Sequence, residues 1–276
     1  MTTIKNSKDR LIFALDVPNK KEAQRLIKEL DDSVGCFKVG LQLFVQEGPD
    51  ILKLIKDHST ADIFLDLKLH DIPATVRGAL KSAEKLGVRY ITIHSIEGEA
   101  ILEASKEVKD SGLEVLAVTL LTSMDEEQLH ALGFEQDTKI CDVVLDRALR
   151  AKQSGCSGII CSGEEIAQVK QKCGEHFKVV VPGIRPEWSQ ISSDDQNRIS
   201  TPRKAIKAGA DLIVVGRPIR DADACLRKQA RARRSEEPRR MRSPHRAAQA
   251  GRHRYADCAL DLLAQRLPCL VGTELA

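Results

Sequence analysis

The chain has 276 residues, of which 30% are charged and 42% are hydrophobic, and its formal net charge is +3. This length and apolar content are enough to bury a core, which excludes wholesale disorder. The longest nearly continuous apolar run, Val115–Leu121, is too short to cross a bilayer, and the polar segment Met1–Arg10 is not a secretory signal. We therefore expect a cytoplasmic globular protein of one or two domains.

The eight cysteines form no CxxC pair and no spacing typical of a zinc site. Without a secretory signal, they are expected to be free thiols, and no metal site is predicted from them.

The composition changes abruptly near residue 221. Residues 1–221 contain 31 Lys and Arg against 34 Asp and Glu, a net charge of −3, whereas residues 222–276 contain 12 against 6, a net charge of +6. The second segment is rich in arginine and has no isoleucine. We therefore predict a domain over 1–221, followed by an atypical, poorly ordered basic segment over 222–276.

Short apolar runs alternate with amphipathic stretches along residues 1–221. The near-continuous apolar character of these runs is typical of strands buried on both faces in a parallel sheet. The predicted strands are Leu11–Val17, Cys36–Leu41, Asp62–Leu69, Tyr90–Ser95, Glu114–Thr122, Gly158–Ser162, Lys178–Ile184 and Leu212–Ile219. The predicted helices are Asn19–Asp31, Pro49–His58, Ile72–Leu86, Glu99–Lys109, Lys139–Gln153, Glu164–Cys173 and Pro202–Ala208.

Eight strands, with a helix after each of the first seven, indicate an α/β fold of the (β/α)8 TIM-barrel type. The alternative is an open doubly wound sheet, but no G-x-G-x-x-G follows any strand. The eighth helix of the barrel is doubtful, because the position where it is expected falls in the basic segment.

Active sites of such barrels lie where the strands end. The candidate site residues that the strands or their ends carry are Asp16, Lys38, Asp66, Lys68, His94, Ser95, Thr122, Ser123, Arg185, Gly216 and Arg217. A structural salt bridge could account for any one Asp–Lys pair. Charges of alternating sign converging from three strands instead favour a functional site, because unpaired charges there are costly.

The segment Asp66–Thr75 carries the densest polar pattern. The strand period of two places Asp66 and Lys68 on one face. Asp71 and Thr75 are four residues apart and are expected to share a helical face. A structural interpretation of Asp71 is an N-cap before Ile72 and Pro73, which does not exclude a catalytic role.

Two glycine–arginine turns predict an anion clamp. Pro182–Arg185 and Gly216–Arg217 follow the seventh and eighth strands, where barrels bind phosphate. Glycine lets backbone N–H groups approach a ligand, and arginine matches phosphate oxygens with a forked pair of donors. The polar segment Glu187–Thr201 between the turns is a candidate lid. The structural alternative is two ordinary turns with solvent-facing arginines.

Together these residues resemble the orotidine 5′-phosphate decarboxylase family over about residues 10–221. The motif Asp66-x-Lys68-x-x-Asp71-Ile72-x-x-Thr75 is similar to the family signature. The other residues that fall in family order are Asp16 in Ala-Leu-Asp, Lys38 in Phe-Lys-Val-Gly, Leu-Thr-Ser123, Pro-Gly-Ile-Arg185, Asp-Gln196 and Gly216-Arg217.

The resemblance implies conversion of orotidine 5′-monophosphate to UMP, the last step of de novo pyrimidine nucleotide synthesis, without a metal or cofactor. It implies that Lys38, Asp66, Lys68 and Asp71 form the catalytic charge array, with Lys68 protonating C6. Its implied binding residues are Asp16 and Lys38 for ribose, Thr122 and Ser123 for the pyrimidine, and Arg185, Gln196, Gly216 and Arg217 for phosphate. It also implies a homodimer in which Asp71 and Thr75 reach the partner's site.

Two alternatives remain open. Asp-x-Lys-x-x-Asp also occurs in related barrels, so a magnesium-dependent sugar-phosphate decarboxylase or an epimerase is the alternative enzyme. For residues 222–276, the leading hypothesis is a frameshift or gene junction, and the alternative is a nucleic-acid-binding arm. The arm is disfavoured because only one aromatic residue, Tyr255, accompanies the arginines.

Overall fold

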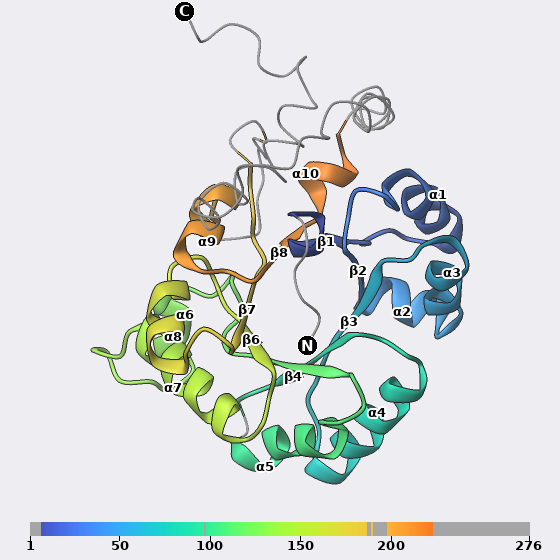
Figure 1. The fold of residues 1–276 in the computed structure, drawn as a ribbon. Coiled ribbons are helices and arrows are strands. Elements are labelled where there is room, and N and C mark those ends of the chain that lie inside the picture. Colours follow the sequence, from blue (N-terminus) through green and yellow to red (C-terminus); the bar gives the residue numbers. More distant parts are fainter. Residues whose placement is uncertain (1–6, 97, 187–188, 190–197, 223–276) are drawn as a thin grey trace, which may run out of the picture.

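The computed structural model describes residues 7–96, 98–186, 189 and 198–222. Eight parallel strands pair in chain order and the eighth pairs with the first, which closes a barrel (Figure 1). The strands are β1 (Leu11–Ala14), β2 (Cys36–Gly40), β3 (Asp62–Leu69), β4 (Tyr90–His94), β5 (Glu114–Val118), β6 (Gly158–Ile160), β7 (Lys178–Val181) and β8 (Leu212–Val215). The predicted (β/α)8 fold is confirmed.

Helices surround this barrel on its outside (Figure 1). The α-helices are α1 (Lys20–Leu30), α2 (Leu41–Glu47), α3 (Asp50–His58), α4 (Pro73–Lys85), α5 (Glu99–Leu102), α6 (Glu126–Ala131), α7 (Ile140–Gln153), α8 (Ile166–Cys173), α9 (Pro202–Ala208) and α10 (Arg217–Arg220). Two 3-10 helices lie at Ser7–Arg10 and Glu103–Val108. Glycines with positive φ are the C-caps of three helices, Gly48 after α2, Gly174 after α8 and Gly209 after α9.

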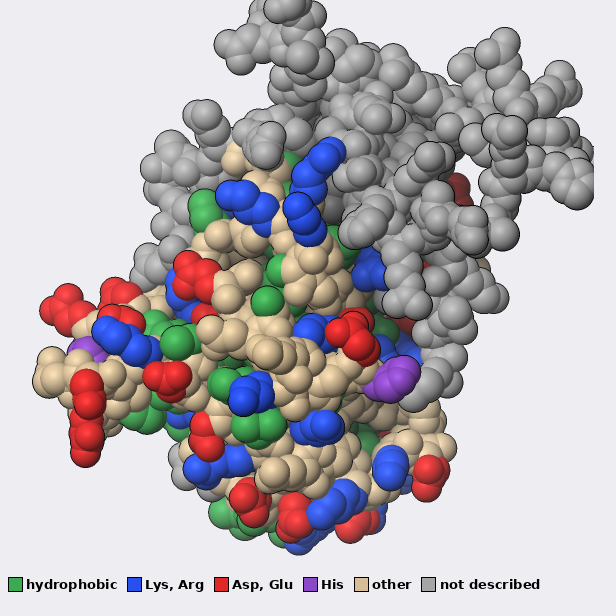
Figure 2. Space-filling view, turned by 60° about the vertical axis from the view of Figure 1, so that its left-hand side comes forward, with side chains coloured by type: hydrophobic (Ala, Val, Ile, Leu, Met, Phe, Trp, Pro, Cys, Tyr) green, Lys and Arg blue, Asp and Glu red, His purple; other side chains and the backbone are tan. Residues whose placement is uncertain are grey.

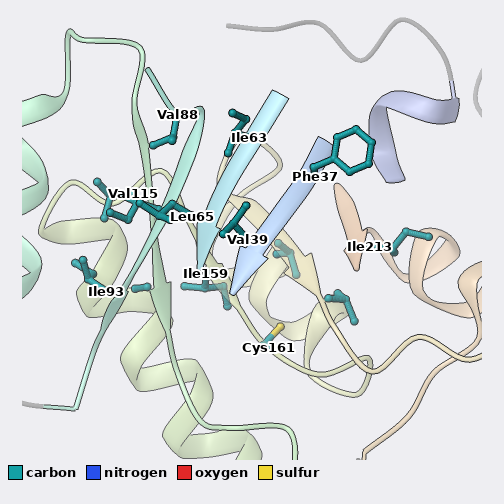
Figure 3. Close-up of a cluster of buried hydrophobic side chains, with 14 of the residues drawn as sticks. Phe37, Val39, Ile63, Leu65, Val88, Ile93, Val115, Ile159, Cys161 and Ile213 are labelled. Atoms are coloured by element: carbon teal, nitrogen blue, oxygen red, sulfur yellow. The ribbon is translucent and has the colours of Figure 1, made fainter. Parts of the chain in front are cut away.

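The alternation of side chains along each strand divides the core into two layers. Ile12 and Ala14 of β1 point into the barrel, where they join Phe64 and Leu116. Leu11 and Phe13 belong to the larger cluster between strands and helices. Figure 3 shows part of this outer layer, in which Phe37, Val39, Ile63, Leu65 and others leave the strands toward the helices. Strands buried on both faces account for the near-continuous apolar runs in the sequence.

Several predicted boundaries are wrong. Most strands end earlier than predicted; β5, for example, ends at Val118 rather than Thr122, because its ladder ends where the chain turns toward the cavity described below. Helices α2, α6 and α10 were not predicted, and α10 begins within the predicted strand Leu212–Ile219. The predicted helix Glu99–Lys109 is a short α-helix, α5, continued by a 3-10 helix.

After β8 the described chain contains only the four-residue α10 and ends at Ala222. Nearly all of the predicted basic segment 222–276 therefore lies outside the described residues, and its boundary and state stay a prediction. Of the eight cysteines, the structure describes five, and all five are free thiols, as predicted. Within the described ranges, no helix has both the length and the apolar character needed to span a membrane.

Surface charges are mixed in sign on the side of the barrel that carries α6 to α9. Figure 2 shows acidic and basic side chains interspersed over this face. The described body thus presents no field of one sign on this side, in keeping with its small net charge.

Candidate active site

A cavity of 460 Å³ opens where the strands end. Nine predicted site residues line it: Asp16, Lys38, Asp66, Lys68, Thr122, Ser123, Arg185, Gly216 and Arg217. Closure of the barrel therefore brings together, at the carboxyl ends of its strands, residues that lie far apart in the chain. His94 and Ser95, also at a strand end, do not line the cavity.

Four charged side chains form a continuous chain of ion pairs along one wall. The Lys38 Nζ atom lies 3.2 Å from Asp16 Oδ1 and 3.5 Å from Asp66 Oδ2. The Lys68 Nζ atom lies 3.0 Å from both carboxylate oxygens of Asp66. The signs alternate, so each charge has an opposite neighbour and the array can persist in a low-dielectric site.

Asp66 is the centre of this array. Burial by itself raises the pKa of its carboxyl, but the neighbouring charges of Lys38 and Lys68 and hydrogen bonds from Lys68 and Thr92 outweigh burial and lower the pKa below its usual value. The Thr92 hydroxyl donates to Asp66 Oδ1 at 2.9 Å. Asp66 is therefore an anion at neutral pH and holds the Lys68 ammonium group in place. Thr92 was not predicted as a site residue.

The backbone at Lys68 departs from a regular strand. Its φ of 51° lies in the left-handed region, which is rare for any residue but glycine. The register between β3 and β4 shifts between Leu65 and Leu69. The Lys68 N–H donates to the Thr92 hydroxyl at 2.8 Å, which fixes the irregular backbone. Asp66 and Lys68 do meet as predicted, but through a bulge that re-aims the lysine rather than through the simple period of two.

Asp71 and Thr75 lie outside this cavity. Both side chains are exposed. The interpretation of Asp71 as an N-cap is wrong: α4 begins at Pro73 and its N-cap is Ile72, while Asp71 Oδ1 accepts from the N–H of Ile72 at 2.6 Å. In a single copy of the chain, these two residues are thus not brought to the charge array.

Another part of the cavity lining carries arginines and close backbone approaches. Arg185, Gly216 and Arg217 line it as predicted. At Gly216, a Cβ atom would lie 3.2 Å from the Cβ of Ala14, so glycine keeps this wall close to β1. Gln196, the other predicted phosphate ligand, and most of the candidate lid lie outside the described residues.

Arg220 also lines the cavity, although it was not predicted as a site residue. It lies in α10, one helical turn after Gly216 and Arg217. Its guanidinium donates to the Asp16 carbonyl at 2.9 Å and pairs with the Asp221 carboxylate at 2.6 and 2.9 Å. The pattern Gly-Arg-Pro-Ile-Arg was the available signal, because residues three apart share a helical face.

The lowered pKa of Asp66 predicts a pH-dependent contribution to stability. A carboxyl whose pKa is lower in the folded state stabilises the fold above its unfolded pKa of about 3.9, and this contribution is lost as the pH falls further. We expect Asp66→Asn to lower the free energy of unfolding at neutral pH, and the gap to the wild type to shrink below about pH 4. Urea unfolding of both proteins at a series of pH values measures this difference in the free energy of unfolding.

The control is Asp57→Asn, which removes a carboxylate from an exposed position on α3. A gap between Asp66→Asn and the wild type that stayed constant from about pH 7 to about pH 3 would contradict the ion-pair account.

The fold and the cavity define a class: α/β-barrel proteins with a charged cavity, partly lined by arginines, at the carboxyl ends of the strands. The family model described as "Orotidine 5′-phosphate decarboxylase / HUMPS family" matches residues 9–232. The chain belongs to this family. The match extends from the barrel into the start of the basic segment.

Curated relatives agree with this assignment. The orotidine 5′-phosphate decarboxylase of Desulfosudis oleivorans is 45% identical over 231 residues, which cover 81% of this chain and 93% of the relative. That of Nostoc sp. is 44% identical over 221 residues, covering 77% and 91%. Both relatives are carboxy-lyases by name.

Solved structures show the same barrel. The orotidine 5′-phosphate decarboxylase of Lactobacillus acidophilus superimposes with a TM-score of 0.66 and 35% identity over 77% of this chain and 92% of that chain. The enzyme of that name from Pyrococcus horikoshii gives a TM-score of 0.61 and 28% identity over 77% and 91%.

Proposed function

We propose that this protein is a carboxy-lyase that converts orotidine 5′-monophosphate to UMP, the last step of de novo pyrimidine nucleotide synthesis, without a metal or organic cofactor. The observation that carries the proposal is the placement of Lys68: its ammonium group is fixed by both oxygens of Asp66 in a cavity that Arg185 and Arg217 also line. The names of the relatives supply the substrate.

The chemistry requires a cation that can also give up a proton. Loss of CO2 leaves an electron pair on C6 of the pyrimidine, and the product needs a proton there. Lys68 supplies both, as a preorganised positive charge and as a general acid. The bidentate contact with Asp66 fixes its direction, so little reorganisation is needed during the reaction.

The remaining residues bind the substrate on either side of this centre. We infer that Asp16 and Lys38 hold the ribose hydroxyls and that Thr122 and Ser123 face the pyrimidine. We infer that Arg185, Gln196, Gly216 and Arg217 hold the phosphate. Charge-assisted, forked contacts from arginine suit a phosphate dianion, and this remote binding energy can be used to lower the reaction barrier.

We infer that the functional unit is a homodimer with Asp71 and Thr75 completing the partner's site. Exposed apolar side chains lie in the same region, at the ends of the neighbouring strands β2, β3 and β4. Val45 of α2 is 81% exposed, Ile72 beside Asp71 is 66% exposed and Ile96 after β4 is 44% exposed. Apolar side chains that follow adjacent strands, around the exposed carboxylate of Asp71, suit a second copy of the chain.

The magnesium-dependent alternative fits the charge array less well. Both oxygens of Asp66 already accept from ammonium groups, so a divalent cation there would have to displace lysines. The described residues contain no group of three His, Cys, Asp or Glu side chains that could hold a metal.

The absorbance of orotidine 5′-monophosphate, which changes on decarboxylation, tests the proposal. We expect the purified chain to consume the nucleotide at the same rate with and without excess EDTA. The phosphate-free nucleoside orotidine is the control, and it should react far more slowly because contacts with Arg185 and Arg217 are lost. Activity that EDTA abolishes and magnesium restores would favour the alternative, and no consumption at all would refute the proposed function.

A further inference from the structure

A buried ion pair lies behind the cavity wall and takes no part in the reaction described above. The Arg198 guanidinium pairs with Glu165 through Nη1, and the two residues are 8% and 2% exposed. Ser162 completes the pair: its N–H and hydroxyl donate to Glu165 Oε2 at 2.9 and 2.7 Å, and its Oγ lies 3.4 Å from Arg198 Nη1. A pair this deeply buried is costly unless its hydrogen bonds are made.

The other contacts of Arg198 reach the cavity wall. Its Nη2 donates to the carbonyl of Leu121 at 3.2 Å, and its backbone N–H donates to the carbonyl of Thr122 at 3.3 Å. Leu121 and Thr122 both line the cavity, as does Ser123 next to them. Arg198 itself does not line the cavity, so it holds the loop after β5 from outside the cavity.

Two residues later, the same segment contacts the anion end of the cavity. The Ser200 N–H donates to the Gly183 carbonyl at 3.2 Å, and the Ser200 carbonyl accepts from the N–H of Arg185 at 2.9 Å. Gly163 permits this approach, because a Cβ at that position would lie 2.5 Å from the Cβ of Ser200. Residues 198–200 thus lie between the loop after β5 and the loop after β7.

We propose that Arg198, fixed by Glu165 and Ser162, is a positioning residue for substrate binding. It sets the wall formed by Leu121–Ser123 in register with the Gly183–Arg185 turn, so that both ends of the nucleotide meet preformed surfaces. The inference rests on the proposed function and deepens it. A displacement of about 1 Å in such a wall can cost up to about a hundredfold in efficiency even though the chemistry is untouched.

Arg147 offers a matched control. It is also a buried arginine, and its Nη1 donates to the carbonyl of Thr119 at 2.5 Å, close to the end of β5. Thr119 does not line the cavity. Replacing either arginine by lysine keeps the positive charge and removes the planar fork of donors, so the two variants lose similar packing and differ in what they support.

The experiment compares the wild type, Arg198→Lys and Arg147→Lys. It measures kcat and KM for orotidine 5′-monophosphate, Kd for UMP by calorimetry, and Tm. We expect Arg198→Lys to raise KM and the UMP Kd by about tenfold or more with a smaller change in kcat. This is the pattern for the loss of an interaction that stabilises the bound substrate and the transition state equally. Arg147→Lys is expected to lower Tm and leave KM and Kd unchanged.

Unchanged KM and Kd in Arg198→Lys would overturn the positioning role and leave a purely structural ion pair. If that variant does not fold, Ser162→Ala, which removes one support of the pair, should raise KM in the same direction; an unchanged KM there would overturn the inference too. A wild type that does not consume the nucleotide refutes the proposed function, whereas an active wild type with an unaffected Arg198→Lys variant refutes only this inference.

Discussion

Lys68→Ala is expected to lower kcat for orotidine 5′-monophosphate by about 10⁴-fold or more, because in the mechanism we propose one side chain provides both the stabilising charge and the proton. Among the residues that the structure describes, no neighbouring cation is placed to substitute for it: the Lys68 ammonium is held by both oxygens of Asp66, and the next cation in the array, Lys38, is engaged by Asp16 and Asp66. The measurement is the initial rate of absorbance change at saturating substrate.

Binding of UMP separates loss of chemistry from loss of fold. The Lys68→Ala variant should keep its affinity for UMP within about tenfold, since the phosphate contacts remain. Lys81→Ala is the control, because it removes an exposed lysine of α4 that pairs with Glu107. Near-normal turnover by Lys68→Ala would remove Lys68 from the mechanism.

Asp71→Asn is expected to lower kcat by about a thousandfold. Two carboxylates about 4 Å apart at an effective dielectric of about 20 repel by about 4 kcal/mol, which corresponds to about three decades in rate. In the single chain, Asp71 lies outside the cavity and its Oδ1 accepts from the N–H of Ile72. The expected loss therefore requires that Asp71 act on the substrate of a second copy.

A hybrid dimer tests this requirement directly. Lys68→Ala and Asp71→Asn chains, coexpressed and purified through two different tags, form dimers in which one site has both defects and the other has none. Such a hybrid should show about half of the wild-type activity, although each parent is nearly inactive. A hybrid as inactive as its parents would mean that Lys68 and Asp71 serve the same subunit's site, or that no shared site exists.

Much of the barrel follows from local sequence pattern, because strands buried on both faces leave apolar runs that fit few other architectures. The sequence pattern predicts the ends of the strands less well. Leu120 and Leu121 continue the apolar character of β5 after its ladder stops, since both line the cavity. Helix α2 begins directly after β2 without a side-chain cap, whereas the Asp125 and Gln128 capping box was an available signal for α6.

The site residues likewise fall into those that the sequence pattern predicts and those that it does not. Asp16, Lys38 and Lys68 were predictable because each lies in the second half of a different strand or just after it, and closure of the barrel brings the carboxyl ends of the strands together. Arg198 and Glu165 were not predictable. They lie 33 residues apart, in segments whose polar composition resembles a solvated surface, and only the three-dimensional structure shows them buried against each other. Asp71 was identified by its motif, and the structure of a single chain leaves it outside the cavity.

At residue 68, the left-handed backbone conformation favours one residue type for stability, whereas the proposed reaction requires another. A side chain with a Cβ atom is held there at a φ of 51°, where glycine or asparagine would sit more easily. A library of this chain selected for heat resistance alone should therefore drift toward Gly or Asn at residue 68 and yield robust barrels without turnover. Engineering of this scaffold has to keep residue 68 fixed and seek its stabilising substitutions elsewhere.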